Sequence, residues 1–300
     1  MLSAIICTYN RDKYLYNALK SIANQNYPVN EYEIVLINNN STDNTEFICQ
    51  KFQEDYSHIS FKYHVEKNQG LSYARNRGVK QSTGDILIFI DDDATVFDDY
   101  LDSISNFFNN NPDILVCGGP IVPVYEEGKP DWISHFTNRL IGGALDEGKN
   151  IKPFSKGNYP GGGNSALRKE AFEKYGLYNP DLGRKGNSLI GAEEKDFYDR
   201  LTKDGKKIYY LPQMGIYHHI PSTKTTVEYF NKLTYSIGKS ERIRTKSISS
   251  ATYYKRVFSE GVKWIASFAL FFIHTLTLHP QKGIKLLQFR LNVTKGLFGF

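Results

Sequence analysis

The chain has 300 residues, of which 40% are hydrophobic, 14% aromatic and 23% charged, and its formal net charge is +5. Disorder is excluded, because 21 Tyr, 19 Phe and 2 Trp supply ample apolar surface for a core. A collagen-like or linker-like chain is excluded because 24 Gly and 11 Pro are near average usage. The length fits one large domain, or one domain with an appendage.

The cysteine pattern and the first residues of the chain indicate the cellular compartment. Cys7, Cys49 and Cys117 form no CxxC pair, which favours a reducing compartment over a disulfide framework or a zinc site. The apolar stretch at 2–7 is shorter than a signal peptide requires, and no basic segment precedes it. We therefore expect a cytoplasmic protein.

The charge is unevenly distributed along the chain. The segment before Lys224 contains 24 basic and 29 acidic residues, whereas the segment from Lys224 onward contains 13 basic and 3 acidic residues. An acidic body with a basic tail indicates that the tail meets an anionic partner, such as a membrane surface or a polymer.

The first ninety residues alternate between short apolar runs, typical of buried strands, and runs with helical spacing. Strands are expected over 3–7, 33–37, 59–65 and 85–90, and helices over 12–26, around Phe47 to Phe52, and over 71–81. This alternation predicts an α/β fold with a mostly parallel sheet flanked by helices, which binds ligands at the carboxyl ends of its strands. Polar clusters at 8–11, 38–43 and 91–93 follow three of these strands, so we expect them to meet in one crevice.

Two common nucleotide motifs are missing from the sequence. No GxGxxG follows these strands and no GxxxxGK[ST] occurs, which argues against dinucleotide oxidoreductases and P-loop NTPases.

Three consecutive aspartates end the fourth predicted strand. In an extended segment Asp91 and Asp93 would point to the same side, where they could bind one divalent cation or one ribose and phosphate unit. Alternatively, Asp92 and Asp93 only cap the following helix or turn.

Five motifs, in order, resemble those of family 2 glycosyltransferases, the inverting type with the GT-A fold that uses nucleotide-sugar donors. They read AIICTYNRDKYLYNALKSIANQ at 4–25, VLINNNSTDNT at 35–45, NQGLSYARNRGVKQSTGDILIFIDDDA at 68–94, GGGNSALRKEAF at 161–172 and GAEEKDFYDRL at 191–201. The resemblance implies a GT-A catalytic domain at 1–223, followed by a helical extension at 224–300. Within the catalytic domain, 1–119 would bind the nucleotide and 120–223 the acceptor.

The resemblance also implies a donor site in the first half. Asn39 stands where the family usually has an aspartate facing the base, and its carbonyl could still accept a hydrogen bond from a pyrimidine N–H. The departure at this position leaves the base open: the resemblance favours uridine, with guanosine and thymidine as alternatives. Arg75 would pair with a phosphate, or else form a salt bridge on a helix surface. The donor-binding residues implied are Thr8, Tyr9, Arg11, Asn39, Gly70, Arg75, Asp91 and Asp92.

A metal site follows from the same resemblance. The family's D-x-D motif corresponds to Asp91 and Asp93, and Asp93 would bind the Mn²⁺ or Mg²⁺ ion that also holds the diphosphate. His218 or His219 would complete the metal shell or contact a phosphate, and a structural role for either histidine is equally open.

Inverting transfer requires a base that deprotonates the acceptor hydroxyl. The pair Glu193-Glu194, followed by Arg200, resembles the acidic family motif, so Glu194 is the expected base. The alternative is that these acids only favour the first turn of a helix. The residues implied at the acceptor and its sugar are Gly162, Gly163, Asn164, Glu193 and Trp132.

The C-terminal extension shows no family chemistry. Its charge-free apolar run at 264–278 is about 15 residues long, short of the ~20 that a spanning helix needs, and Lys and Arg flank it. Such a segment suits association with an anionic membrane surface. A buried helical hairpin against the catalytic domain or a dimer partner is the main alternative.

Together these features predict an inverting, metal-dependent glycosyltransferase with a nucleotide-sugar donor, UDP-linked by preference, and a saccharide or lipid-linked acceptor. It would act on the cytoplasmic face of a bacterial plasma membrane, as a peripheral protein, in the synthesis of surface polysaccharide or glycolipid. The alternatives are a sugar-1-phosphate nucleotidyltransferase and a non-catalytic saccharide-binding scaffold. Nucleic-acid binding is not expected, because no aromatic RNA motif accompanies the basic residues. The oligomeric state is left open.

Overall fold

The computed structural model describes residues 1–155, 157–186 and 188–300, and the chain divides into two compact units. Unit 1 comprises Met1–Pro123, Gly143–Pro180 and Glu194–His219, and unit 2 comprises Val124–Gly142, Asp181–Glu193 and Ile220–Phe300. The domain boundary expected at residue 223 stays a prediction.

Within the described residues, unit 1 is built on an eight-stranded sheet of order β3-β2-β1-β4-β9-β6-β10-β8. β1, β2, β3 and β4 run parallel, whereas β9 is antiparallel to both β4 and β6. The strands are β1 (Leu2–Thr8), β2 (Tyr32–Asn38), β3 (Phe61–Val65), β4 (Ile86–Asp91), β6 (Val116–Gly118), β8 (Lys152–Pro153), β9 (Asn164–Arg168) and β10 (Ile208–Tyr210). A second sheet has the order β5-β11-β7, with β5 (Ala94–Val96), β7 (Ile121–Tyr125) and β11 (Ile216–Ile220).

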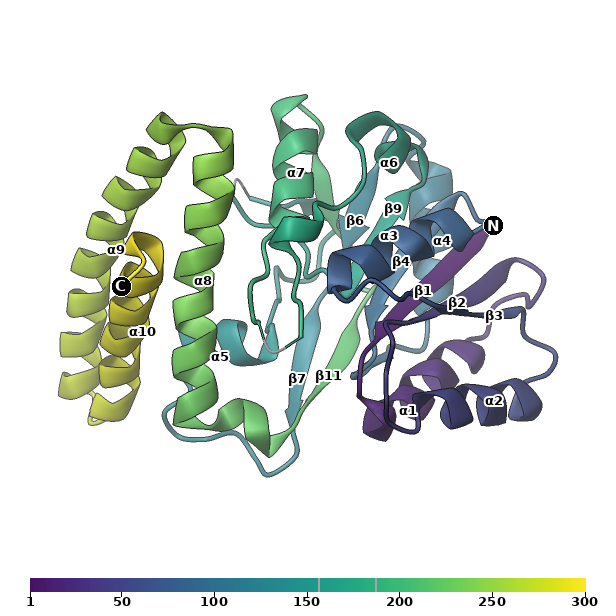
Figure 1. The fold of residues 1–300 in the computed structure, drawn as a ribbon, viewed down its shortest axis with the longest axis horizontal. Coiled ribbons are helices and arrows are strands. Elements are labelled where there is room, and N and C mark those ends of the chain that lie inside the picture. Colours follow the sequence, from purple (N-terminus) through teal and green to yellow (C-terminus); the bar gives the residue numbers. More distant parts are fainter. Residues whose placement is uncertain (156, 187) are drawn as a thin grey trace. The chain divides into compact units, whose positions relative to one another are not determined.

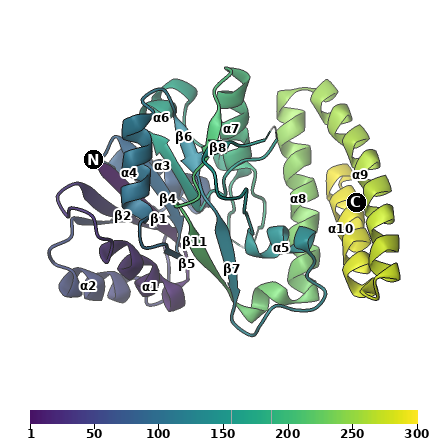
Figure 2. The same cartoon turned by 180° about the vertical axis from the view of Figure 1, so that it is seen from behind.

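Helices cover both faces of the large sheet, because alternate residues of its central strands point to opposite sides. Ala4 and Ile6 of β1 belong to the core cluster shared with α1, α2 and α4, whereas Ile5 belongs to the cluster shared with α3, α6 and α7. Accordingly, α3 lies in front of the sheet in Figure 1 and α4 lies in front of it in Figure 2. These helices are α1 (Asp12–Ala23), α2 (Thr45–Asp55), α3 (Leu71–Gln81), α4 (Tyr100–Asn110), α6 (Glu170–Tyr175) and α7 (Glu193–Lys203).

The α/β order predicted for the first ninety residues is confirmed. The four expected strands are β1 to β4, and the helix expected over 71–81 has those bounds. The helix expected over 12–26 ends earlier, at Ala23, where the chain enters the turn before Pro28.

Unit 2 contains the helical extension expected at the C-terminus. Its three long helices lie side by side (Figure 1), and α10 packs closely on α8 because both have a glycine at the crossing. A Cβ at Gly238 would collide with the carbonyl of Val293, and one at Gly296 with the carbonyl of Tyr235. The helical segments that begin in unit 2 or at its border are α5 (His135–Gly142), η1 (Pro180–Leu182), η2 (Ser222–Thr225), α8 (Val227–Ile248), α9 (Ser250–Leu276) and α10 (Pro280–Phe298).

An ion-pair network crosses the three C-terminal helices. Glu241 of α8 pairs with Arg244 at 3.1 Å and with Arg256 of α9 at 3.2 Å. Glu260 of α9 pairs with Arg256 at 2.7 Å and with Arg290 of α10 at 2.8 Å. Each carboxylate therefore has two guanidinium partners, which compensates its loss of hydration on burial.

Candidate active site

The polar clusters expected to meet do lie at one edge of the large sheet. The parallel register places Cys7 of β1 beside Asp91 of β4, and Thr8 beside Asn38 of β2. Thr8 is buried, whereas Tyr9 in the following loop is exposed. The carboxyl ends of the three strands thus bring the N-terminal loop, the 38–43 loop and the aspartates together.

The three aspartates form a turn and do not continue the strand. Asp91 ends β4, and Asp92 and Asp93 lie in the tight connection to β5. The expectation of an extended segment is therefore wrong, although Asp91 and Asp93 still converge through the turn. Asp92 and Asp93 are buried, while 42% of the Asp91 side chain is exposed. Burial raises the pKa of Asp92 to about 6, against the opposing charge of Arg11.

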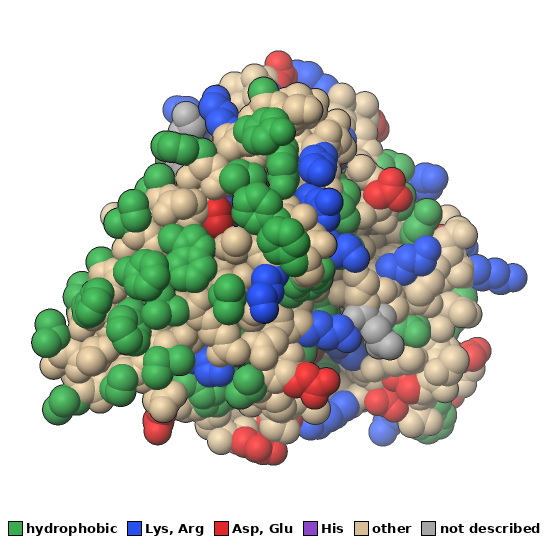
Figure 3. All heavy atoms as spheres, turned by 60° about the vertical axis from the view of Figure 1, so that its left-hand side comes forward, with side chains coloured by type: hydrophobic (Ala, Val, Ile, Leu, Met, Phe, Trp, Pro, Cys, Tyr) green, Lys and Arg blue, Asp and Glu red, His purple; other side chains and the backbone are tan. Residues whose placement is uncertain are grey.

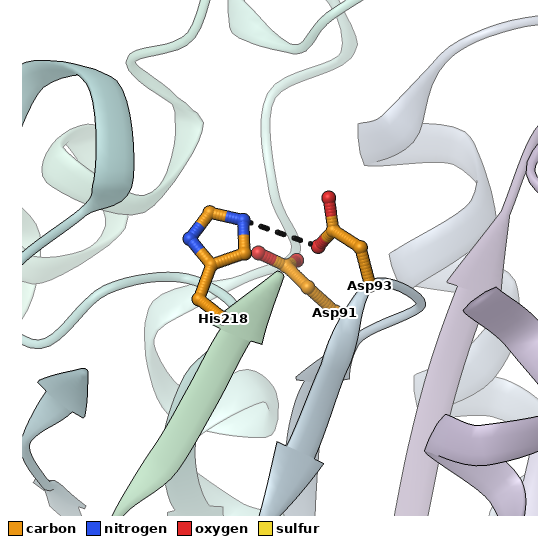
Figure 4. A group of neighbouring side chains, drawn as sticks. All are labelled: Asp91, Asp93 and His218. Atoms are coloured by element: carbon orange, nitrogen blue, oxygen red, sulfur yellow. Dashed lines mark ion pairs between the residues drawn. The ribbon is translucent and has the colours of Figure 1, made fainter. Parts of the chain in front are cut away.

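Asp91, Asp93 and His218 form a group that could hold a metal ion, since their ligand atoms lie within 4.8 Å of one another. Nε2 of His218 is 3.2 Å from Oδ1 of Asp93 (Figure 4). The antiparallel pairing of β11 with β5 produces this arrangement by placing His218 opposite Ala94. Two carboxylates and one imidazole suit Mn²⁺ or Mg²⁺.

His219 has different neighbours from His218. Its backbone N–H donates to the carbonyl of Asp93 at 2.8 Å, and its ring stacks on Tyr14 with centroids 6.4 Å apart. Among the described residues, the metal-type group includes His218 and leaves out His219. This contact of Tyr14, in the first turn of α1 after the N-terminal loop, was not expected from the sequence.

Arg11 contacts the aspartates. Its guanidinium donates to Oδ1 of Asp92 at 3.0 Å and to Oδ2 of Asp93 at 2.6 Å. The charge of Asp92, and to a lesser extent that of Asp93, raises the pKa of Arg11 above its usual range. Arg11 was expected among the donor-binding residues, and the structure places its charged end at the D-x-D motif.

Glu194 is held by Arg75. Arg75 lies on α3 with only 3% of its surface exposed, and its guanidinium donates to Oε1 of Glu194 at 2.6 Å. The same guanidinium lies 3.9 Å from Oδ1 of Asp91. A phosphate contact or a salt bridge on the helix surface was expected for Arg75, and the observed ion pair joins its buried guanidinium to a carboxylate whose side chain is 24% exposed. Arg75 thus links the expected base to the D-x-D motif.

The glycine loop before β9 lies against both carboxylates. A Cβ at Gly162 would collide with the carboxylate of Glu194, and a Cβ at Gly163 would collide with that of Asp91. A side chain at either glycine would therefore displace the neighbouring carboxylate. Asn164 supports the loop from inside, because its fully buried amide bonds to the Tyr100 hydroxyl and to the carbonyls of Pro120 and Met214.

Asn39 braces the loop that leads into α3. Its amide nitrogen donates to the carbonyls of Glu66 and Asn68, and its carbonyl accepts from the N–H of Gly70 at 2.7 Å. Gly70 has φ 144°, which favours glycine, and it directly precedes the helix of Arg75. Asn39 is buried, and in this structure its side-chain carbonyl stabilises the loop through the hydrogen bond from Gly70.

Asp43 lies just before the first turn of α2. Its carboxylate accepts from the backbone N–H and the hydroxyl of Thr45, and from the N–H of Asp12 at the start of α1.

Two of the expected acceptor residues belong to unit 2. Trp132 packs edge-on against Phe230, with centroids 5.4 Å apart, and Nζ of Lys285 lies 5.5 Å from its ring. Glu193 is buried and begins α7. Their contact with an acceptor stays a prediction.

Among the described residues, the unit 1 site gathers more carboxylates than guanidinium groups. Each guanidinium contacts two carboxylates. A cluster rich in carboxylates suits a divalent cation, so the residues fit such an ion in chemistry as well as in position. The groups concerned are the carboxylates of Asp91, Asp92, Asp93 and Glu194 and the guanidinium groups of Arg11 and Arg75.

Comparison with known proteins agrees with this picture. Residues 3–176 match the family described as glycosyl transferase family 2. The chain is 27% identical over 254 residues to the glucosyl-dolichyl phosphate glucuronosyltransferase of Haloferax volcanii, covering 81% of this chain and 76% of that one.

Solved structures share the fold. The mannosyltransferase PcManGT from Pyrobaculum calidifontis, in complex with GDP-Man and Mn²⁺, superposes with a TM-score of 0.66 at 17% identity, covering 99% of this chain and 87% of that one. S. aureus TarS in complex with UDP-GlcNAc gives a TM-score of 0.55 at 18% identity, covering 99% and 92%. The GT-A fold expected from the sequence is confirmed.

Proposed function

The chain belongs to glycosyl transferase family 2, and we propose that it transfers a sugar from a UDP-sugar to a lipid-linked saccharide. The observation that carries the proposal is that one glycine loop lies against both Glu194 and Asp91, with Arg75 between them. A donor diphosphate at Asp91 and an acceptor hydroxyl at Glu194 would therefore be close enough for the sugar to pass from one to the other.

The acidic group would hold the metal ion. Asp91, Asp93 and His218 are the residues that would bind Mn²⁺ or Mg²⁺. When bound, the ion would neutralise the negative charge that develops on the leaving nucleoside diphosphate. Arg11 keeps the buried carboxylates of Asp92 and Asp93 paired.

Glu194 would act as the base. It would take the proton of the acceptor hydroxyl while that oxygen forms a bond to the anomeric carbon. The bond from that carbon to the phosphate oxygen breaks on the opposite face, which inverts the configuration. The contribution of Arg75 is to fix the position of the carboxylate, and Gly162 leaves room for it.

The donor and acceptor classes rest on similar proteins. TarS is solved with UDP-GlcNAc and PcManGT with GDP-Man, so a nucleoside-diphosphate sugar is proposed here, with uridine preferred. The Haloferax relative is named for a glucosyl-dolichyl phosphate, which supports a lipid-linked acceptor. We place the enzyme at the cytoplasmic face of the plasma membrane, making surface polysaccharide or glycolipid.

Two alternatives predict different products. A sugar-1-phosphate nucleotidyltransferase would release pyrophosphate from a nucleoside triphosphate, and a saccharide-binding scaffold would release nothing. The family match and the intact Asp91, Asp93 and Glu194 favour sugar transfer.

The test is release of nucleoside diphosphate from a panel of sugar nucleotides, with lipid-linked acceptors and Mn²⁺. Glu194→Gln should lower kcat by at least about 100-fold, since it removes the base and keeps the size of the side chain. Glu173→Gln, an exposed glutamate on α6, is the matched control and should leave kcat unchanged. Wild-type turnover by Glu194→Gln would refute the base, and pyrophosphate release from nucleoside triphosphates would refute the reaction.

A further inference from the structure

The helix α9 has an inverted distribution of side chains. Among its described residues the buried ones are Glu260 and Ser267, both polar. Large apolar side chains are strongly exposed on it, among them Phe258 at 77%, Ile265 at 72% and Leu276 at 83%. A helix on the surface of a soluble protein normally buries its apolar residues and exposes its polar ones.

The exposed apolar residues share one face. They recur at intervals of three, four and seven positions, which is the spacing of one side of an α-helix. Figure 3 shows hydrophobic side chains gathered over the C-terminal helices. This face, called the α9 face below, consists of Tyr254, Phe258, Val262, Ile265, Phe272 and Leu276.

The opposite side of α9 fixes the direction of this face. Arg256 and Glu260 join the ion-pair network with α8 and α10, and Trp264 donates to the hydroxyl of Thr294 on α10 at 3.0 Å. These bonds prevent the helix from rotating to bury its apolar side, because rotation would break the pairs of buried charges. The α9 face therefore remains turned outward in the isolated chain.

The surrounding charge is of one sign. From Ser250 to Phe300 the sequence contains seven Lys or Arg and a single acid, Glu260, which is buried in the network. Lys255, Lys263 and Lys295 are exposed. An apolar face with exposed cations, in a segment whose one acid is buried, complements an anionic lipid headgroup layer.

The helix is suited to lie along a membrane. α9 is long and apolar enough to be a candidate span by length and composition. However, Arg256, Glu260 and Lys263 occupy its first half, and the charge-free remainder is shorter than the ~20 residues that a spanning helix needs. The paired charges on its inner side would also lie in hydrocarbon if it crossed the bilayer.

We propose that the α9 face docks on an anionic bilayer surface, with Tyr254, Phe258, Ile265 and Phe272 entering the headgroup and acyl boundary. This docking extends the proposed function, whose lipid-linked acceptor would lie in the same membrane. The test of membrane docking measures vesicle binding without the transfer reaction. The docking proposal and the proposed sugar transfer can therefore be refuted independently of each other.

The experiment is co-sedimentation of the full chain with vesicles of phosphatidylcholine, with and without about one third phosphatidylglycerol. The wild type should bind the anionic vesicles at least about tenfold more tightly, and high salt should weaken this binding. The double variant Phe258→Gln/Phe272→Gln should weaken it by at least about tenfold, because it removes two exposed aromatic rings. Lys255→Gln/Lys263→Gln should weaken binding to anionic vesicles only.

Phe47→Gln is the matched control, since Phe47 is an apolar side chain 65% exposed on α2. It should bind like the wild type. Equal binding to both vesicle types, or no loss in the Phe258→Gln/Phe272→Gln variant, would overturn the proposal. A stable wild-type dimer that this variant converts to a monomer, without vesicle binding by either, would show that a second copy covers the face. Resistance of the membrane-bound protein to alkaline extraction would show a spanning helix instead.

Discussion

Both units bury charged side chains, but the balance of charge differs between them. In the unit 2 network the carboxylates of Glu241 and Glu260 are shared among three guanidinium groups, so every acid has two cationic partners. In the described part of the unit 1 site, four carboxylates share the guanidinium groups of Arg11 and Arg75. A network with two cations for each acid holds helices together, whereas a site rich in carboxylates can take up a cation.

This comparison predicts that removing an acid has opposite effects on activity and stability in the two units. Removing a carboxylate from the site should remove activity and cost little stability, because each guanidinium keeps a second carboxylate. Removing a carboxylate from the network should cost stability and leave the activity of the folded protein intact, because it exposes unpaired buried cations.

The largest expected effect is at Asp93. Asp93→Asn should lower sugar transfer by about 1000-fold, because it removes a metal-type ligand from the place where charge develops on the leaving group. The midpoint of thermal unfolding measured without metal should change little. Excess EDTA should inactivate the wild type to a similar extent, and full activity in EDTA would contradict the role of the metal.

The second effect is at Glu260. Glu260→Gln should lower the free energy of unfolding by about 3–5 kcal/mol, because Arg256 and Arg290 lose a buried partner. Denaturant unfolding followed by circular dichroism measures the change. Glu228→Gln, at an exposed position in the same three-helix region, is the control and should change it by less than about 0.5 kcal/mol. An equal loss in both variants would show that the network has no special role.

A smaller effect is expected at the glycine loop. Gly162→Ala should displace the carboxylate of Glu194 and lower kcat by about 10- to 100-fold, with little change in thermal stability. Gly261→Ala is the control, since a Cβ there meets open space. Unchanged kcat in Gly162→Ala would show that the loop does not position Glu194.

The smallest effect concerns Glu33, a buried and paired acid of unit 1 outside the site. Burial alone would raise its pKa, but hydrogen bonds from Lys62, Ser3 and Thr83 outweigh burial and hold the pKa below its usual range. Its contribution to stability is therefore present above the unfolded pKa, about 4.3, and lost as the pH falls through the folded pKa. Glu33→Gln should cost about 1–3 kcal/mol at pH near 7, and the difference from wild type should shrink near pH 3. A difference independent of pH would contradict the ion pair.

Local patterns in the sequence were sufficient for most of the fold. The apolar runs of β1, β2 and β4 and the helical spacing of α3 predict these elements, because burial and periodicity are local properties. The strand ends also indicated which polar clusters meet.

The pairings inside the site depend on tertiary geometry and could not be read from the sequence. The pair of Arg75 and Glu194 joins residues 119 positions apart, and Arg11 reaches the aspartates across 82 positions. The choice between His218 and His219 depends on the register of β11 against β5. The apolar run of α9 was visible, but which of its faces is exposed depends on where Arg256 and Glu260 find partners.

The most direct test of the account is calorimetric titration of Mn²⁺ into the full chain in the presence of UDP. Wild type should bind one ion, Asp93→Asn should bind none in the same concentration range, and Glu260→Gln should bind like the wild type at a temperature where it is folded. Unchanged Mn²⁺ affinity in Asp93→Asn would contradict the claim that the carboxylates of the site bind a cation.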